Sequence, residues 1–161
     1  MPDPYPLIYL HGLFADSHGF KASLLRNLFP QVITPDFSGS LEERMDLLLR
    51  ILGDTHGWRI VGSSFGGLMG ALFTLQHPEQ VEKLVLFSPA LIWPDFANAG
   101  FEPVNVPVVI YHGARDELVP IAVVRPLAER AFLNLVFHSM DDDHGMQQTV
   151  QALDWGSLLA T

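Results

Sequence analysis

Short apolar runs alternate along the chain with longer stretches of helical periodicity. Most of the runs are continuous, as in strands that helices cover on both faces of a sheet, so they predict buried strands. Six strands are expected, at residues 7–10, 32–34, 58–61, 84–87, 106–111 and 135–138. Because helical segments separate them, we expect the strands to pair in parallel through right-handed crossovers.

Helices are predicted at residues 17–29, 40–52, from the middle sixties to 77, 122–132 and 146–159. The second of them opens with Ser40-Leu-Glu-Glu43, which fits a capping box. Pro126 lies inside the fourth, where a proline can bend a helix. The pattern as a whole predicts an α/β fold, a three-layer α/β/α sandwich around a mostly parallel six-stranded sheet.

Composition supports a single folded domain over residues 1–161. Hydrophobic residues make up 48% of the chain and charged residues 17%, which excludes intrinsic disorder. There is no cysteine, so disulfides, thiolate metal sites and a cysteine nucleophile are excluded.

The charge and the apolar runs bear on partners and location. A net charge of −9 argues against binding to nucleic acid or to anionic lipid. No run approaches the ~18 apolar residues of a transmembrane helix, and the first run is too short for a signal peptide. We therefore expect a cytoplasmic protein without membrane insertion, and the sequence leaves the oligomeric state open.

The candidate chemistry lies directly after the strands, where parallel sheets bind their ligands. Gly62-Ser-Ser-Phe-Gly66 stands between a predicted strand and a predicted helix, the context of a nucleophile elbow. Ser64 would then be exposed above the sheet, and the helix start would offer the amide of Phe65 to an anionic intermediate. The alternative is a glycine-rich turn without chemistry.

A second loop, His11-Gly12-Leu13, follows the first strand. It is expected to open on the same crevice as the elbow, so that the amide of Leu13 completes an oxyanion hole with that of Phe65. A plain glycine turn is the alternative. We expect His11 to be a hydrogen-bonded structural histidine.

An acid and a base follow the fifth and sixth strands. Asp116 is placed to orient an imidazole, with Glu117 as competitor and a solvated turn carboxylate paired with Arg115 as the alternative. His144 alone among seven histidines lies in a loop after the last strand, and it suits a general base. His112 is expected in a core or turn role. The acidic run 141–143 is interpreted as a solvated loop or as helix caps, and no metal site is expected.

Taken together, these segments resemble the α/β-hydrolase family. The resemblance rests on His11-Gly12, Gly62-x-Ser64-x-Gly66, His112-Gly-Ala-Arg-Asp116 and Asp143-His144-Gly145, in the family's order. It implies Ser64 as nucleophile, Asp116 as acid and His144 as base, with the amides of Leu13 and Phe65 as oxyanion hole. It also implies the strand order 2-1-3-4-5-6. The connection 88–105 is short, so the chain looks like a minimal member without a cap.

The expected reaction is cleavage of small acyl esters by a serine hydrolase, carboxylesterase-like, through an acyl-enzyme. It needs no metal or organic cofactor, and its partner is a small-molecule acyl substrate. A thioesterase or amidase remains an alternative, as does a non-catalytic module that binds a small molecule or a partner. Four aromatic residues either line a small acyl pocket or cover the sheet edge or an oligomer contact: Phe14, Trp93, Phe96 and Phe101.

Overall fold

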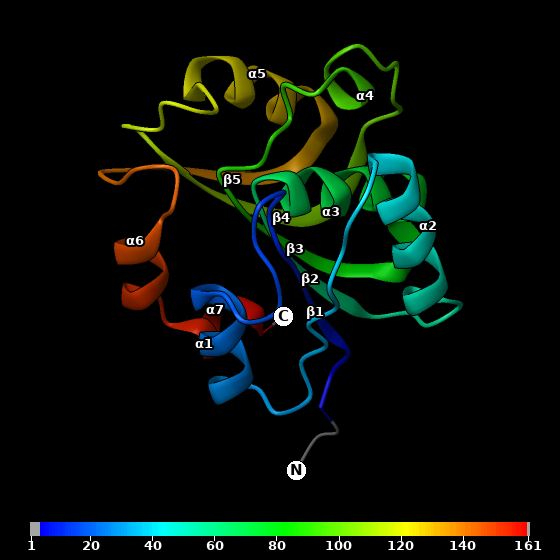
Figure 1. Cartoon of the computed structure of the whole chain (residues 1–161). Coiled ribbons are helices and arrows are strands. Elements are labelled where there is room, and N and C mark those ends of the chain that lie inside the picture. Colours follow the sequence, from blue (N-terminus) through cyan, green and yellow to red (C-terminus); the bar gives the residue numbers. More distant parts are fainter. Residues whose placement is uncertain (1–3, 161) are drawn as a thin grey trace.

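The computed structural model describes residues 4–160 and has a five-stranded sheet at its centre (Figure 1). The strands are β1 (Leu7–Leu10), β2 (Trp58–Ser63), β3 (Val81–Phe87), β4 (Val104–Gly113) and β5 (Phe132–Met140). They pair in parallel in the order β1-β2-β3-β4-β5. The predicted α/β class and parallel pairing are confirmed.

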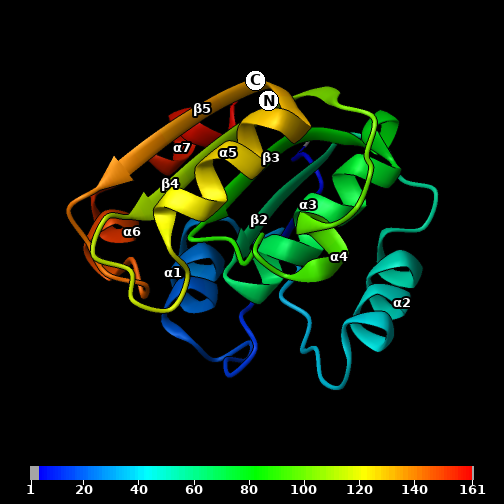
Figure 2. The same ribbon diagram turned by 90° about the horizontal axis from the view of Figure 1, so that it is seen from above.

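Helices cover both faces of this sheet (Figure 2). One face carries α1 (Phe20–Leu28), α6 (Gln147–Ala152) and α7 (Trp155–Leu159). The other carries α2 (Leu41–Leu52), α3 (Phe65–Gln76), α4 (Pro94–Ala97) and α5 (Ile121–Ala131). A 3-10 turn, η1 (Pro78–Gln80), precedes β3. Because the strands are apolar on both faces, helices cover each face, and the fold has the three layers that the sequence predicted.

The alternation of side chains along each strand divides the core into two hydrophobic clusters. In β3, Leu84 and Leu86 face the cluster with α2, α3 and α5, while Val85 and Phe87 face the cluster with α1, α6 and α7. All four are fully buried. Because burying such a side chain contributes roughly 1.5–3 kcal/mol, both faces of every central strand help to hold the sheet.

The prediction of a strand at residues 32–34 was wrong. It is a single bridge in which Ile33 pairs with β1: its N–H donates to Leu7 (2.9 Å) and its carbonyl accepts from Tyr9 (2.9 Å). Pro30 and Pro35 flank the segment, and a proline has no N–H to extend a ladder. The bridge lies beside β1, at the edge where the predicted order places the second strand. The sheet therefore has five strands instead of the six predicted.

The predicted helix at 146–159 is two helices, α6 and α7. The side chain of Asp154 accepts a hydrogen bond from the N–H of Ser157, which starts a new helix there. The predicted capping box of α2 is confirmed: Ser40 Oγ accepts from the N–H of Glu43 (3.1 Å), and Glu43 reaches back to the N–H of Ser40. Within residues 4–160, no helix has the length and apolar character needed to cross a membrane.

Candidate active site

Ser64 sits in a strained turn between β2 and α3. Its φ of 54° and ψ of −115° are rare for a residue with a side chain and cost of order 1–3 kcal/mol. The end of β3 holds the turn in place: Ser64 N–H donates to Phe87 (3.0 Å), and the Ser64 carbonyl accepts from Ala90 (2.9 Å). The surrounding hydrogen bonds therefore over-determine the conformation that the elbow motif predicts.

Gly66 allows this turn to touch the end of β1. A Cβ on Gly66 would lie 2.0 Å from the carbonyl oxygen of Leu10, and one on Gly62 would lie 2.6 Å from that of Gly66. No side chain fits in either place. The contact brings the loop after β1 beside the elbow, where Gly12 faces the Cβ of Ser64.

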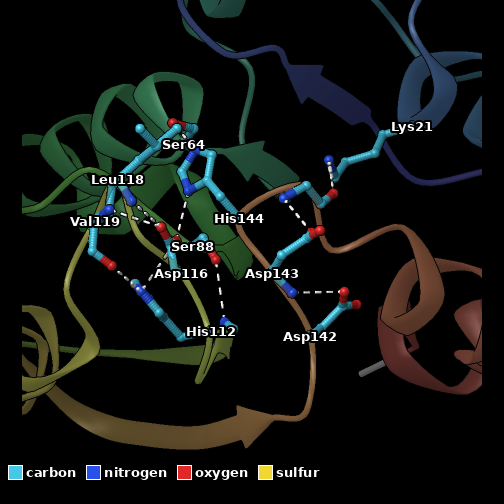
Figure 3. A network of polar contacts seen from close by, with 12 residues as sticks. Lys21, Ser64, Ser88, His112, Asp116, Leu118, Val119, Asp142, Asp143 and His144 are labelled. Carbon is cyan, nitrogen blue, oxygen red and sulfur yellow. Dashed lines mark hydrogen bonds and ion pairs between the residues drawn. The ribbon is translucent and has the colours of Figure 1, made fainter.

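His144 links Ser64 to Asp116 (Figure 3). Its Nε2 lies 2.9 Å from Ser64 Oγ, and its Nδ1 lies 2.6 Å from Asp116 Oδ2. An ionised carboxylate can only accept, so Nδ1 carries the proton and Nε2 is free to accept from the serine hydroxyl. The three predicted residues come from three loops at the carboxyl edge of the sheet, and the structure brings them together.

Asp116 is fixed through both of its carboxylate oxygens. Oδ1 accepts from the N–H groups of Leu118 (2.9 Å) and Val119 (2.8 Å), which leaves Oδ2 directed at His144. Burial alone would raise the pKa of Asp116, but the Val119 amide and the His144 ring hold that pKa below its usual value. The competitor Glu117 is exposed, so the structure favours Asp116.

A second histidine, His112, lies beneath the acid. It is buried, with Nε2 2.8 Å from the carbonyl of Val119 and 3.5 Å from Asp116 Oδ2. Burial lowers the pKa of His112, so the ring is neutral and Nε2–H donates to Val119. Its core or turn role was expected from the sequence, but its contact with Asp116 was not.

The loop that carries His144 is hydrogen-bonded along its length (Figure 3). Buried Asp142 accepts from Asp143 N–H (2.8 Å) and from both the N–H and the hydroxyl of Thr149. Beyond the histidine, Lys21 Nζ donates to the carbonyl of Gly145 (2.7 Å). The N-cap residue of α6 is Met146, and Asp142 serves the helix from outside by accepting from the N–H of Thr149 in its first turn.

Arg115, which the sequence offered as a partner of Asp116, pairs instead with the exposed end of the acidic run 141–143. Asp141 is almost fully exposed and pairs with Arg115 at 3.0 Å. The arginine therefore pairs with Asp141, and the carboxylate of Asp116 is left to the His144 ring and the two amides of its own turn.

The two segments expected to form the oxyanion hole both adjoin Ser64. Phe65 is the first residue of α3, where backbone N–H groups have no partner within the helix. Leu13 follows Gly12 in the loop beside the elbow. His11 is buried and structural: it accepts from Phe37 N–H (2.8 Å) at Nε2 and donates to the Gly12 carbonyl from Nδ1. Its contacts hold this loop in place.

The four aromatic candidates are divided between surface and core. Phe14 is 99% exposed, and Trp93 is 40% exposed with its ring edge-on to Phe65 at 5.1 Å. Phe96 is 2% exposed in the cluster with α2, α3 and α5, and its ring makes a tilted contact at 5.4 Å with the partly buried Phe101. Phe96 therefore belongs to the core and Phe101 packs against it, while Phe14 and Trp93 are the exposed members of the four.

An open depression of about 1370 Å³ lies on the α1 and α6 side of His144. The residues lining it come from the loops of Asp116 and His144 and from the two helices: Phe20, Lys21, residues 114–118, residues 142–145, Gln147, Gln148 and Gln151. Over residues 4–160, no three His, Asp or Glu side chains are grouped as metal ligands.

Comparisons with solved structures show the same fold over nearly the whole chain. Alpha/beta hydrolase domain-containing protein 10 from mouse is 19% identical with a TM-score of 0.77, over 96% of this chain and 90% of that chain. A monoacylglycerol lipase from Paleococcus ferrophilus is 16% identical with a TM-score of 0.75, over 96% and 94%. The chain spans most of both.

A third structure is more similar in sequence. A putative hydrolase of the alpha/beta superfamily from Xanthomonas campestris is 25% identical with a TM-score of 0.74, over 92% of this chain and 93% of that chain. Among curated protein sequences, none matches. The model of the alpha/beta hydrolase fold family matches residues 5–103, more than half of the chain. Together with the five-stranded parallel sheet, this match shows that the chain belongs to the alpha/beta hydrolase family.

Proposed function

We propose that this protein is a serine hydrolase that cleaves small acyl esters, carboxylesterase-like, with Ser64, His144 and Asp116 as its triad. The observation that carries the proposal is the continuous path of 2.9 Å and 2.6 Å from the Ser64 hydroxyl through His144 to Asp116. A serine hydroxyl becomes nucleophilic when a base accepts its proton, and a buried carboxylate stabilises the imidazolium that forms.

In this mechanism Ser64 Oγ attacks the carbonyl carbon while its proton moves to His144 Nε2. The carbonyl oxygen becomes an oxyanion that the amides of Phe65 and Leu13 stabilise, a contribution of about 10²–10³ in turnover for each donor. His144 then gives its proton to the leaving alcohol and the ester bond breaks. Water, activated by the same ring, releases the acid and restores Ser64. No metal or organic cofactor takes part.

The size of the connection between β3 and β4 supports short substrates. Its one helix is α4 (Pro94–Ala97), four residues long, and we propose that the single domain acts without a cap. The depression beside His144 is open and does not enclose a substrate. Short and medium acyl esters suit such a site.

Labelling with a fluorophosphonate followed by peptide mass spectrometry tests this proposal. We expect one adduct, on Ser64, because only an activated serine attacks the phosphorus atom. The adduct should be absent in Ser64→Ala and much weaker in His144→Ala, while Ser63→Ala, which changes the neighbouring buried serine, keeps it. Folded protein without an adduct would instead support a binding module.

A further inference from the structure

Arg44 is a buried cation without a counter-charge. It lies in the first turn of α2 and is 5% exposed. Its Nε donates to the carbonyl of Gly39 (3.1 Å), but its Nη1 is buried without any hydrogen-bond partner. Within residues 4–160, no carboxylate lies within ion-pair distance of it.

A buried guanidinium without a counter-ion is costly, because the single hydrogen bond to Gly39 replaces only part of its hydration. Burial lowers the pKa of Arg44, yet a guanidinium stays protonated at neutral pH. One contact offsets part of the cost: the guanidinium carbon lies 5.3 Å from the centre of the Phe65 ring, which is a cation–π distance. An anion that comes near the guanidinium would offset more of this cost.

Phe65 connects this cation to the candidate active site. It directly follows Ser64, and its ring contacts both the Arg44 guanidinium, at 5.3 Å, and the Trp93 ring, in a T-shaped contact at 5.1 Å. Trp93 is the part of this group that reaches the surface. The three side chains therefore form one packed wall next to Ser64, on the α2 and α4 side. Trp93 is its exposed member, and Phe65 and the positive charge of Arg44 are buried behind it.

The position of His144 assigns this wall to the acyl part of a substrate. The leaving alcohol takes its proton from His144, and that ring lines the depression on the α1 and α6 side. The alcohol therefore departs on that side. The acyl chain, bonded to the same carbon, is left on the opposite side, where Phe65 and Trp93 stand.

We propose that the preferred acyl group carries a terminal carboxylate, so that the substrates are half-esters of short dicarboxylic acids and Arg44 selects them. The inference rests on the proposed esterase function. The net charge of −9 repels anions in general, so such a preference has to come from a local cation. Direct contact is not required, because a charge in a partly desolvated site acts over several ångströms.

Two p-nitrophenyl esters of adipic acid test this: the free half-ester and its neutral methyl ester, with kcat/KM measured for each. The wild-type protein should prefer the anionic ester. In Arg44→Met the ratio of anionic to neutral kcat/KM should fall about tenfold. Arg44→Lys keeps the charge and should keep most of the preference. Arg50→Met removes an exposed cation from the same helix and should leave the ratio unchanged.

An unchanged ratio in Arg44→Met would overturn the inference, and so would an equal fall in Arg50→Met. If Arg44→Met does not fold, the ratio measured for the wild-type protein still tests the proposal. A higher kcat/KM for the neutral ester than for the anionic one contradicts it. Failure of the esterase function itself looks different, because the wild-type protein would then hydrolyse neither ester and Ser64 would not take up the fluorophosphonate.

Discussion

Asp116 uses its two oxygens for two purposes. Oδ1 closes its own turn by accepting from the amides of Leu118 and Val119, and Oδ2 accepts a hydrogen bond from His144 Nδ1–H. The first set of bonds orients the carboxylate, and the second orients the imidazole. His112 supports the arrangement from below through the carbonyl of Val119. The orientation of the His144 ring thus depends on a turn of four residues.

We expect Asp116→Asn to lower kcat about 10³–10⁴-fold with little loss of stability. The amide oxygen can still accept from Leu118 and Val119, but the amide NH₂ then faces His144 Nδ1 and favours the wrong tautomer. Ester hydrolysis and thermal unfolding measure the two effects. Glu117→Gln, one residue on and exposed, is the control. A large loss of kcat in Glu117→Gln with normal activity in Asp116→Asn would move the acid to Glu117.

At the level of the elements, the elbow joins β2, α3 and the end of β1. The Ser64 turn is strained, and its position depends on how closely α3 approaches Leu10. Likewise α6 and the His144 loop are tied together by Asp142, whose side chain reaches the third residue of the helix. Contacts of this kind between the elements set the distances between Ser64, His144 and Asp116.

Gly66→Ala should be strongly destabilising, by several kcal/mol, because its Cβ would lie 2.0 Å from a backbone oxygen that cannot move cheaply. Urea unfolding measures the loss, and fluorophosphonate labelling should disappear as the elbow shifts. Gly100→Ala is the control, since nothing lies within 4 Å of its Cβ position. Equal stability of the two variants would show that the approach of α3 to Leu10 is not tight.

Asp142→Ala should cost about 1–3 kcal/mol at neutral pH, because it removes the acceptor for the N–H and hydroxyl of Thr149 in the first turn of α6. Burial would raise the pKa of Asp142, but the amides of Thr149 and Asp143 hold it below its usual value of about 4. Ionised Asp142 therefore stabilises the fold above that pH, and its contribution is lost as the pH falls through the lowered value.

Urea unfolding at pH 7 and pH 3 follows this loss, and the difference between wild type and Asp142→Ala should shrink at the lower pH. Asp141→Ala, whose side chain is 96% exposed, should stay within about 0.5 kcal/mol of wild type. A difference between wild type and Asp142→Ala that is as large at pH 3 as at pH 7 would show that the charge of Asp142 does not contribute.

In the whole molecule, one sheet separates two hydrophobic clusters that share every central strand. Neither cluster can be exposed without unpairing strands that the other needs, so unfolding should be cooperative. Differential scanning calorimetry should show one transition, with a calorimetric enthalpy equal to the van't Hoff value and roughly 110 kcal/mol near 60 °C for a chain of this length. Two separate transitions would contradict a single domain.

The sequence predicted the parallel sheet and the convergence of Ser64, Asp116 and His144 because each follows an apolar strand, and parallel strands end at one edge. It predicted a strand at residues 32–34, where two prolines limit the pairing to a single bridge. The sequence Asp154-x-x-Ser157 signals a helix start that divides the last predicted helix in two. The apolar periodicity continues across it, so the pattern predicted one helix. Arg44 was missed although it lies on the apolar face of α2 between Leu41 and Leu48. Its missing counter-charge depends on side-chain positions that spacing does not give.

An acyl-enzyme on Ser64 would be the chemical signature of the proposed triad. Mixing the protein with p-nitrophenyl acetate, quenching in acid and analysing the peptides by mass spectrometry detects it. We expect one acetyl group on the peptide that contains Ser64, formed with a burst of p-nitrophenolate and absent in Ser64→Ala. Steady hydrolysis without an acylated Ser64, or an acetyl group on another residue that turns over at the rate of hydrolysis, would contradict the triad.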